Sequence, residues 1–300
     1  MSLQHPDPVV TQTDTEHAID YAGWRVLTTT YPISNAGQLD ALQASLGIPL
    51  PEMTFGSNAL TLTHIASGWK LTFDTAHALS GVKNGPLVDG DGGVRVDYAD
   101  AWLKSRTDPN SQTPMPKTVE TKPYDWTYTT TYSGHSAPQS VVWQAASPSE
   151  PSHTIPLAEL TRRDPILYYA QTTLYEDELH DNGSSLVLCR VRVMPGCLFA
   201  LVRFVLRVDN VLFRVHDTRI YHSLASNPPL VVREISGWEA PYAVVKRRLP
   251  DKRDLTPLTD ANFISQSLSQ IEGAHGQPGV TKWRGLGSRV EVAILPSGPA

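Results

Sequence analysis

Residues 185–222 read SLVLCRVRVMPGCLFALVRFVLRVDNVLFRVHDTRIYH, and this stretch decides the fold. Apolar and polar residues alternate along nearly its whole length, which is the period of a β-strand with one buried face. Residues 194–197 and 209–210 interrupt the alternation with Pro, Gly, Asp and Asn, which favour tight turns. The stretch therefore predicts antiparallel strands joined as a meander, and this sheet is expected to form the core.

The second face of the predicted meander is basic. With a two-residue turn at 209–210, five arginines share this face: Arg190, Arg192, Arg203, Arg207 and Arg214. A buried charge that loses its partner costs about 3–5 kcal/mol, so these side chains need partners or solvent. In one interpretation they pair with the acidic residues 176–178 or stay solvated. In the other, some of them clamp a carboxylate or an acidic peptide, because the guanidinium group can donate two parallel hydrogen bonds to a carboxylate.

The composition is that of a globular protein. The chain has 300 residues, 40% hydrophobic and 18% charged, which is enough to bury a sizeable core. A net charge of −5 and a pI near 6.0 argue against a nucleic-acid binder. No apolar run is long enough to span a bilayer, and the start of the chain has no signal-peptide pattern. We therefore expect a cytoplasmic protein, with access to the nucleus left open, whose two cysteines are reduced.

The expected organisation is one domain after a short tail. Residues 1–18 are polar and rich in Pro and Thr, which predicts disorder. Residues 19–300 are expected to form a single α+β domain, with a mainly antiparallel meander core and short peripheral helices. Within it, Asn35 is placed to cap a helix over 36–46, and residues 260–268 and 289–295 suggest a late helix and strand.

Two polar clusters are candidates for chemistry. The sequence contains no GxxxxGK[ST], HExxH, CxxC or GxSxG motif. EDELHD (176–181) and HDTRIYH (216–222) could together serve a metal-dependent hydrolase, with the histidines as general bases. Alternatively, Asp217 and Arg219, which follow core residues Phe213 and Val215 on one strand, could form the rim of a peptide-binding groove. In the aromatic stretch 122–132, which has the composition of a strand, Tyr124 and Asp125 are expected to be free to face a partner.

Several long motifs resemble one protein family. They are PEMTFGSNALTL (51–62), KPYDWTYTT (122–130), RRDPILYY (162–169), LYEDELHDNG (174–183), RVRVMP (190–195), LVRFVLRVDNVLFR (201–214) and DTRIYH (217–222). On these motifs the chain resembles the TOR signalling pathway regulator-like family, whose fungal members are known as Tap-interacting proteins. The resemblance covers about residues 20–236, and residues 250–300 form an extension outside it.

The resemblance implies a regulator that is not an enzyme and needs no cofactor. Such a protein binds the catalytic subunits of type 2A-like Ser/Thr protein phosphatases, with a cleft for their acidic C-terminal tail. In fungi it also contacts the phosphatase-associated Tap protein and acts in TOR signalling. For this chain we expect no nucleic-acid or membrane partner and a monomeric state.

The resemblance also indicates particular residues. Asp217 matches a family residue implicated in phosphatase binding, Val215 is a smaller hydrophobic partner beside it, and Ile155 aligns with another contact. His77 stands where the family carries an Asp, so a polar contact there is altered. Together with the residues singled out from the sequence itself, the predicted partner-binding set is Asp217, Val215, Ile155, His77, Arg219, Arg214 and Tyr124. No catalytic or metal-binding residue is expected.

Overall fold

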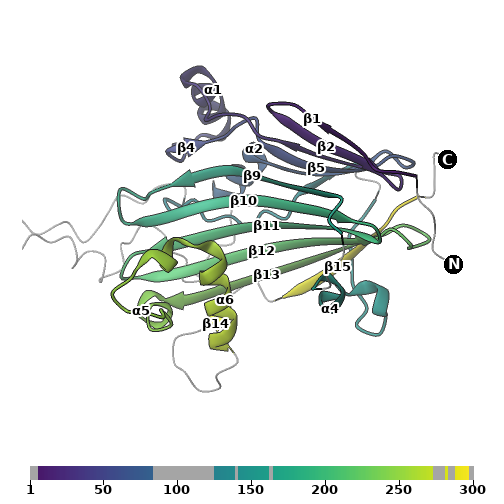
Figure 1. Cartoon of the computed structure of the whole chain (residues 1–300). Helices are drawn as coiled ribbons and strands as arrows, with labels where there is room; N and C mark the ends of the chain where they lie inside the picture. Colours follow the sequence, from purple (N-terminus) through teal and green to yellow (C-terminus); the bar gives the residue numbers. More distant parts are fainter. Residues whose placement is uncertain are drawn as a thin grey trace, which may run out of the picture.

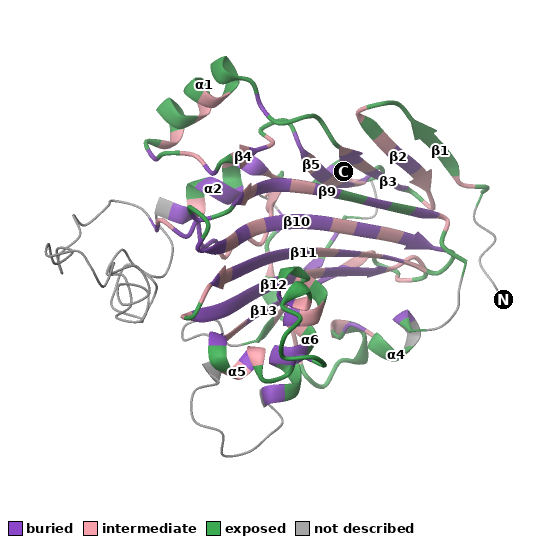
Figure 2. Ribbon diagram, turned by 60° about the vertical axis from the view of Figure 1, so that its left-hand side comes forward, coloured by how far each residue is buried: buried purple, intermediate pink, exposed green. Residues whose placement is uncertain are grey.

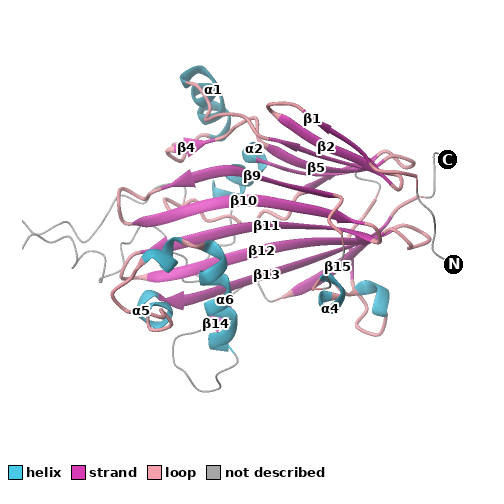
Figure 3. Ribbon diagram, in the orientation of Figure 1, coloured by secondary structure: helices cyan, strands magenta, loops and turns pink. Residues whose placement is uncertain are grey.

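The computed structural model describes residues 6–83, 125–138, 141–161, 165–272, 281–282 and 288–296. Within these residues the chain is built mainly from antiparallel strands in two sheets, with a few short helices (Figure 3). The α+β fold with a mainly antiparallel core and short peripheral helices is therefore confirmed. The described residues contain no helix with both the length and the apolar character needed to cross a membrane.

The smaller sheet, called here the N-terminal sheet, comes mostly from the first 74 residues. Its order is β1 (Val9–Gln12), β2 (Glu16–Tyr21), β3 (Trp24–Thr29), β5 (Ala59–His64), β6 (Trp69–Asp74) and β7 (His135–Ala137). The expected disorder of residues 1–18 is wrong from residue 9 onward, while residues 1–5 lie outside the described chain. The polar composition predicted disorder, but every residue of β1 is exposed, so its side chains need not be apolar. The strand forms because its main chain pairs with β2.

The larger sheet, called here the central sheet, contains the predicted meander. Its order is β4 (Met53–Thr54), β9 (Tyr168–Asp177), β10 (Gly183–Met194), β11 (Cys197–Val208), β12 (Leu212–Ser223), β13 (Leu230–Pro241), β15 (Arg289–Ile294) and β8 (Gln144–Ala145), with β14 (Thr281–Lys282) also paired to β13. Strands β10 to β13 are long and antiparallel throughout. The meander expected from the alternation of residues 185–222 is confirmed.

One loop in the meander has a residue more than expected. Val208 pairs with Leu212, so three residues rather than two connect β11 and β12, and Asn210 adopts a left-handed φ of 62°. Because side chains alternate between the faces of a strand, one extra residue moves every following side chain to the other face. Arg214 therefore lies on the face opposite to the other four arginines, and the predicted five-arginine face is wrong at this position.

The two sheets pack face to face (Figure 1). Apolar side chains from both inner faces form one large core, which includes Trp24, Leu62 and Trp69 from the N-terminal sheet and Val191 and Phe204 from the central sheet. Helices α1 (Ala36–Leu46) and α2 (Thr75–Lys83) contact each other near the N-terminal sheet, and Asn35 caps α1 as predicted. Cys189 is buried and Cys197 half-buried, and the two are not joined by a disulfide bond.

Among the residues that the structure describes, the opposite surface of the central sheet, called here the outer face, is covered at its two ends (Figure 2). Three short elements from beyond β13 cover one end: α5 (Tyr242–Lys246), η3 (Thr256–Thr259) and α6 (Ala261–Glu272). They enclose a second apolar cluster with Phe213 and Val215. The other end is covered by η2 (Pro151–His153) and α4 (Leu157–Leu160), beside a third cluster around Ile155 and Tyr221.

Candidate functional site

Three of the predicted partner-binding residues lie side by side on the outer face of β12. Val215, Asp217 and Arg219 occupy alternate positions of this strand, so their side chains point to the same side. Val215 is fully buried in the cluster under α6, and Asp217 is 1% exposed. The side chain of Arg219 keeps 26% of its surface exposed. Of the three, Arg219 is therefore the one that a partner could reach without rearrangement.

Asp217 is the centre of a buried charge network. Arg203 on β11 donates two hydrogen bonds to it, from Nε to Oδ1 at 2.7 Å and from Nη2 to Oδ2 at 2.8 Å. Arg219 Nη2 donates a third, to Oδ2 at 3.0 Å, and its Nη1 pairs with Glu234 on β13. Arg203 and Asp217 face each other in neighbouring strands, which fixes the bidentate geometry. The network gives each carboxylate oxygen of Asp217 at least one hydrogen-bond donor.

The arginines of the outer face fasten the covering segments to the sheet. Arg203 Nη1 and Arg190 Nη1 donate to the Asn262 side chain of α6, at 3.3 and 3.0 Å. Arg207 Nη1 donates to the carbonyl of Leu258 at 3.1 Å, and Arg192 Nη2 to the carbonyl of Leu160 at 3.2 Å. From the sequence, one interpretation was that these arginines pair with residues 176–178 or stay solvated. The structure shows neither arrangement for the contacts given above. The sequence analysis also missed Asn262, which carries no signal of its own.

Between the two covered ends the outer face remains partly open. Arg190, Leu201, Arg219 and Glu234 form one row across β10 to β13, and all four are half-buried. We call this row the open strip. Asn262 of α6 reaches its Arg190 end, and Ile155 lies in the cluster on its other side, packed with Tyr221. The open strip thus combines two guanidinium groups with an apolar centre, and one glutamate closes its far end.

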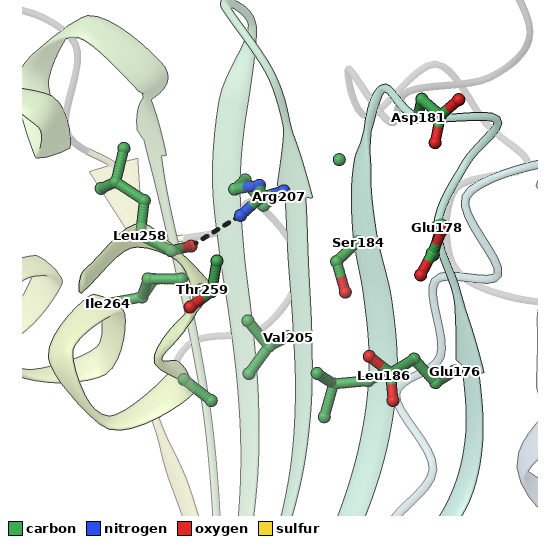
Figure 4. Close-up of a pocket in the computed structure, with 12 residues that line it drawn as sticks. Glu176, Glu178, Asp181, Ser184, Leu186, Val205, Arg207, Leu258, Thr259 and Ile264 are labelled. Carbon is green, nitrogen blue, oxygen red and sulfur yellow. Dashed lines mark hydrogen bonds between the residues drawn. The ribbon is translucent and has the colours of Figure 1, made fainter. Parts of the chain in front are cut away.

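A pocket of 330 Å³ lies next to α6, at the start of β10 (Figure 4). Leu186, Val205 and Ile264 give it apolar walls, while Glu176, Glu178 and Asp181 form an acidic side. Burial and the neighbouring Glu178 raise the pKa of Glu176 above its usual range. Arg207 also lines the pocket, but three carboxylates outnumber it, so an acidic peptide would meet net like charge and a cation suits the pocket better.

Two of the other predicted contacts, Arg214 and His77, are not on the outer face. Arg214 is fully buried on the inner face, where Nε donates to Glu239 at 2.7 Å and Nη1 to Thr129 at 3.2 Å. It cannot meet a partner there, so this prediction is wrong, and its cause is the three-residue loop. His77 lies at the start of α2, beside the N-terminal sheet. Tyr124 lies outside the described residues.

The aromatic stretch after Tyr124 is not a strand. Residues 125–134 run as turns and irregular chain, and Asp125 is 4% exposed instead of free to face a partner. Its Oδ1 accepts hydrogen bonds from the main chain and hydroxyl of Thr127, at 2.8 and 2.5 Å, which fold the chain into a turn. The hydroxyls of Tyr175 and Ser185 donate to carbonyls of Tyr128 and Thr127, so the main chain of this segment is bound to the central sheet.

The two clusters proposed for a hydrolase do not converge. His216 and His222 point to the inner face, where burial lowers the pKa of each to about 4, whereas Asp217 points to the outer face. His180 is exposed at a turn near the acidic pocket. Among the described residues, neither EDELHD nor HDTRIYH brings three ligand atoms together at metal-binding distances. The alternative of a metal-dependent hydrolase built from these clusters is therefore not supported by their geometry.

Fold and surface together define a class: an antiparallel two-sheet protein with a charged, partly open surface strip between two covering segments. The chain belongs to the TIP41-like family, whose model matches residues 53–246. It is 33% identical over 249 residues to a TIP41-like protein of Homo sapiens, which covers 83% of this chain and 84% of the relative. It is 34% identical over 270 residues to the type 2A phosphatase activator TIP41 of Saccharomyces cerevisiae, covering 85% of this chain and 72% of the relative.

A plant relative extends the comparison. A TIP41-like protein of Arabidopsis thaliana is 37% identical over 235 residues, covering 74% of this chain and 77% of the relative. The family expected from the sequence motifs is thus confirmed. The matched residues 53–246 include β4 and the whole meander and end within α5, whereas η3 and α6 follow them. The helix that covers Val215 therefore lies outside the part of the chain that the family model describes.

Proposed function

We propose that this protein is a non-enzymatic regulator that binds the catalytic subunit of a type 2A-like Ser/Thr protein phosphatase. The support is its membership of the TIP41-like family, in which two yeast relatives are named type 2A phosphatase activators. The observation that carries a binding role at a particular place is the open strip, where Arg219 and Arg190 stay half-buried beside the buried Asp217. Binding there needs no catalytic residue of this chain.

Charge decides where an acidic C-terminal tail of the phosphatase would lie. The acidic pocket beside Glu176 and Glu178 would repel it, whereas the open strip offers two guanidinium groups around Leu201. A guanidinium has five N–H donors, so Arg219 keeps donors for a terminal carboxylate beside its bonds to Asp217 and Glu234. An aromatic or leucine side chain can pack on Leu201. We place the tail across the strip, between α6 and the segment around Ile155, with Arg219 as the carboxylate contact.

A calorimetric titration tests this site. The titrant is an acidic, aromatic C-terminal peptide of the phosphatase, with either a free or an amidated end. We expect micromolar binding of the free acid, and about tenfold weaker binding after amidation or in Arg219→Ala, because a hydrogen bond to a charged group contributes about 1.5–3 kcal/mol. Arg219 is the appropriate position because Arg203 still holds Asp217 with two hydrogen bonds when Arg219 is removed.

The matched control is Arg25→Ala, which removes a partly exposed arginine of the N-terminal sheet that pairs with Asp20. It should leave the affinity unchanged. Equal binding of both peptide forms by wild type and Arg219→Ala would refute the assignment of the carboxylate to Arg219. If no peptide binds, the same variants are tested against the whole catalytic subunit, and an unchanged affinity there would remove the open strip from the proposal.

The wider role is proposed on the family alone. We place the protein in TOR signalling, as a monomer in the cytoplasm with access to the nucleus, and with a Tap-type phosphatase-associated protein as a second partner. Co-purification of a Tap-type protein with wild type and with Arg219→Ala would show whether this second partner depends on the phosphatase site. Light scattering of the purified protein gives the oligomeric state.

A further inference from the structure

A second group of polar side chains gathers away from the outer face, where β6 meets α2 and β7. Asp74 is the last residue of β6, His77 lies in the first turn of α2, and His135 begins β7. The three residues bring one carboxylate oxygen and two imidazole nitrogens within 4.8 Å of one another. The proposed phosphatase-binding function uses neither Asp74 nor His135.

The fold places these side chains together by two local devices. Asp74 Oδ1 accepts the main-chain N–H of His77 at 2.9 Å, which caps the start of α2 and fixes the carboxylate. Gly134 has a left-handed φ of 86°, and a Cβ there would lie 2.7 Å from Cε1 of Phe73. Only glycine lets the chain approach β6 this closely, and His135 follows directly, paired with Thr72. The approach of His135 to Asp74 is therefore built into the main chain.

The distances between the ligand atoms suit a tetrahedral metal ion. The Nδ1 atoms of His77 and His135 lie 2.9 and 3.5 Å from Asp74 Oδ2. Bonds of about 2.0–2.1 Å around a tetrahedral zinc ion place neighbouring ligand atoms about 3.3 Å apart, between the two observed values. The Tyr132 hydroxyl donates to the carbonyl of Thr72 at 2.9 Å, so it accepts from His135 Nδ1, also at 2.9 Å, which would release this proton on binding a metal ion. It borders the position that a fourth ligand or a water molecule would take.

Ordinary helix capping does not account for the whole cluster. A cap needs only Asp74 Oδ1, yet Oδ2 is approached by both imidazoles. The rings of His77 and His135 stack with their centroids 3.8 Å apart, and turning one of these solvent-accessible rings would aim both Nδ1 atoms at one ion beside Oδ2. One bound cation would be ligated by both Nδ1 atoms and the carboxylate together. The side chains of His77 and His135 are 54% and 39% exposed, so an ion has direct access from solvent.

We propose that Asp74, His77 and His135 form a binding site for a divalent transition-metal ion, with zinc as the best match. Two imidazoles and one carboxylate are ligands that Zn²⁺ accepts, and three protein ligands leave one position open. The site is independent of the open strip, so its test does not depend on phosphatase binding.

The experiment is a titration of Zn²⁺ into the full-length protein after chelator treatment, followed by calorimetry. We expect one saturable site, with the affinity at least tenfold weaker in His77→Ala and in His135→Ala. The same variants should lose the visible absorption of bound Co²⁺, which reports a protein-ligated ion directly. Circular dichroism and thermal unfolding without metal check that each variant is folded, and both positions are exposed enough for substitution to be tolerated.

The matched control is His180→Ala, which removes an exposed histidine next to the acidic residues of EDELHD. It should bind Zn²⁺ as wild type does. The proposal is overturned if wild type shows no saturable binding, or if His77→Ala and His135→Ala bind as tightly as wild type. Loss of binding in His180→Ala alone would also overturn it, by moving the ion to the 176–181 cluster.

Discussion

Asp217→Ala is expected to lower the free energy of unfolding by about 3–5 kcal/mol, because it leaves a buried arginine without its partner. Arg203 is 7% exposed and gives Asp217 two hydrogen bonds, at 2.7 and 2.8 Å. Without the carboxylate, Nε and Nη2 of Arg203 lose these acceptors under α6. Guanidinium unfolding followed by tryptophan fluorescence measures the change.

Two further variants make this prediction specific. Asp20→Ala breaks the Arg25–Asp20 pair, whose side chains are 45% and 33% exposed, and should cost no more than about 1 kcal/mol. Replacing both members of the buried pair, as Arg203→Met with Asp217→Leu, should recover most of the lost stability, because a well-packed apolar pair avoids the unpaired charge. An unfolding midpoint of Asp217→Ala equal to that of wild type would contradict a structural role for the pair.

A loss of stability in Asp217→Ala would give Asp217 a structural role, in addition to any contact with a partner. The resemblance predicts a phosphatase contact at Asp217, yet in this fold its carboxylate is fully occupied by Arg203 and Arg219. A variant at Asp217 could therefore lose its partner because the outer face is disturbed. Arg219 and Leu201, which are half-buried on the same face, report on binding with less effect on the fold.

The strands and helices that depend on the period of apolar residues and on local capping signals could be predicted from the sequence. The alternation over 185–222 fixed the meander, and Asn35 identified the start of α1, because both are encoded in neighbouring residues. The face on which Arg214 lies could not be predicted, since it depends on whether the loop at 209–211 has two or three residues. The strands within residues 9–18 were also missed, because main-chain pairing of an exposed strand leaves little trace in composition.

The sites were harder to predict than the fold because they join distant segments. Asn262 reaches Arg203 from 59 positions away, and no motif marks it. Asp74 and His77 are neighbours in a helix turn, but His135 meets them only through the pairing of β6 with β7. A continuous motif cannot indicate such a group, because its ligands come from separate segments of the chain.

Acidification is expected to destabilise this protein well above the pH at which most carboxylates titrate. His216 and His222 lie on the inner face of β12, and burial lowers the pKa of each from 6.5 to about 4. Arg289 lowers the pKa of His216 further while Asp217 opposes it, and His222 donates from Nδ1 to the carbonyl of Leu230 at 2.9 Å. Both residues are 2% exposed, so the positive charge of a second proton on either imidazole ring would be buried.

The direction follows from which state binds the protons. Between pH 6.5 and about 4 the unfolded chain protonates these histidines while the folded protein does not, so stability falls as the pH falls. One pH unit corresponds to about 1.4 kcal/mol per histidine, which gives about 2 kcal/mol for each between pH 6.5 and 5. Burial raises the pKa of Asp125, which binds a proton more readily in the folded state and offsets part of this loss.

Guanidinium unfolding at pH 7.5, 6.0 and 5.0 measures the effect, and we expect a loss of about 3–4 kcal/mol across this range. His216→Gln and His222→Gln should each flatten the slope by about half, whatever their absolute stability, because the glutamine amide does not titrate. His180→Gln, at an exposed position, should keep the wild-type slope. A slope unchanged in both buried variants would mean that other groups carry the acid sensitivity. If the slope falls as predicted, the inner face of β12 limits the stability of the fold in acid, while the open strip on its other face stays free to serve a partner.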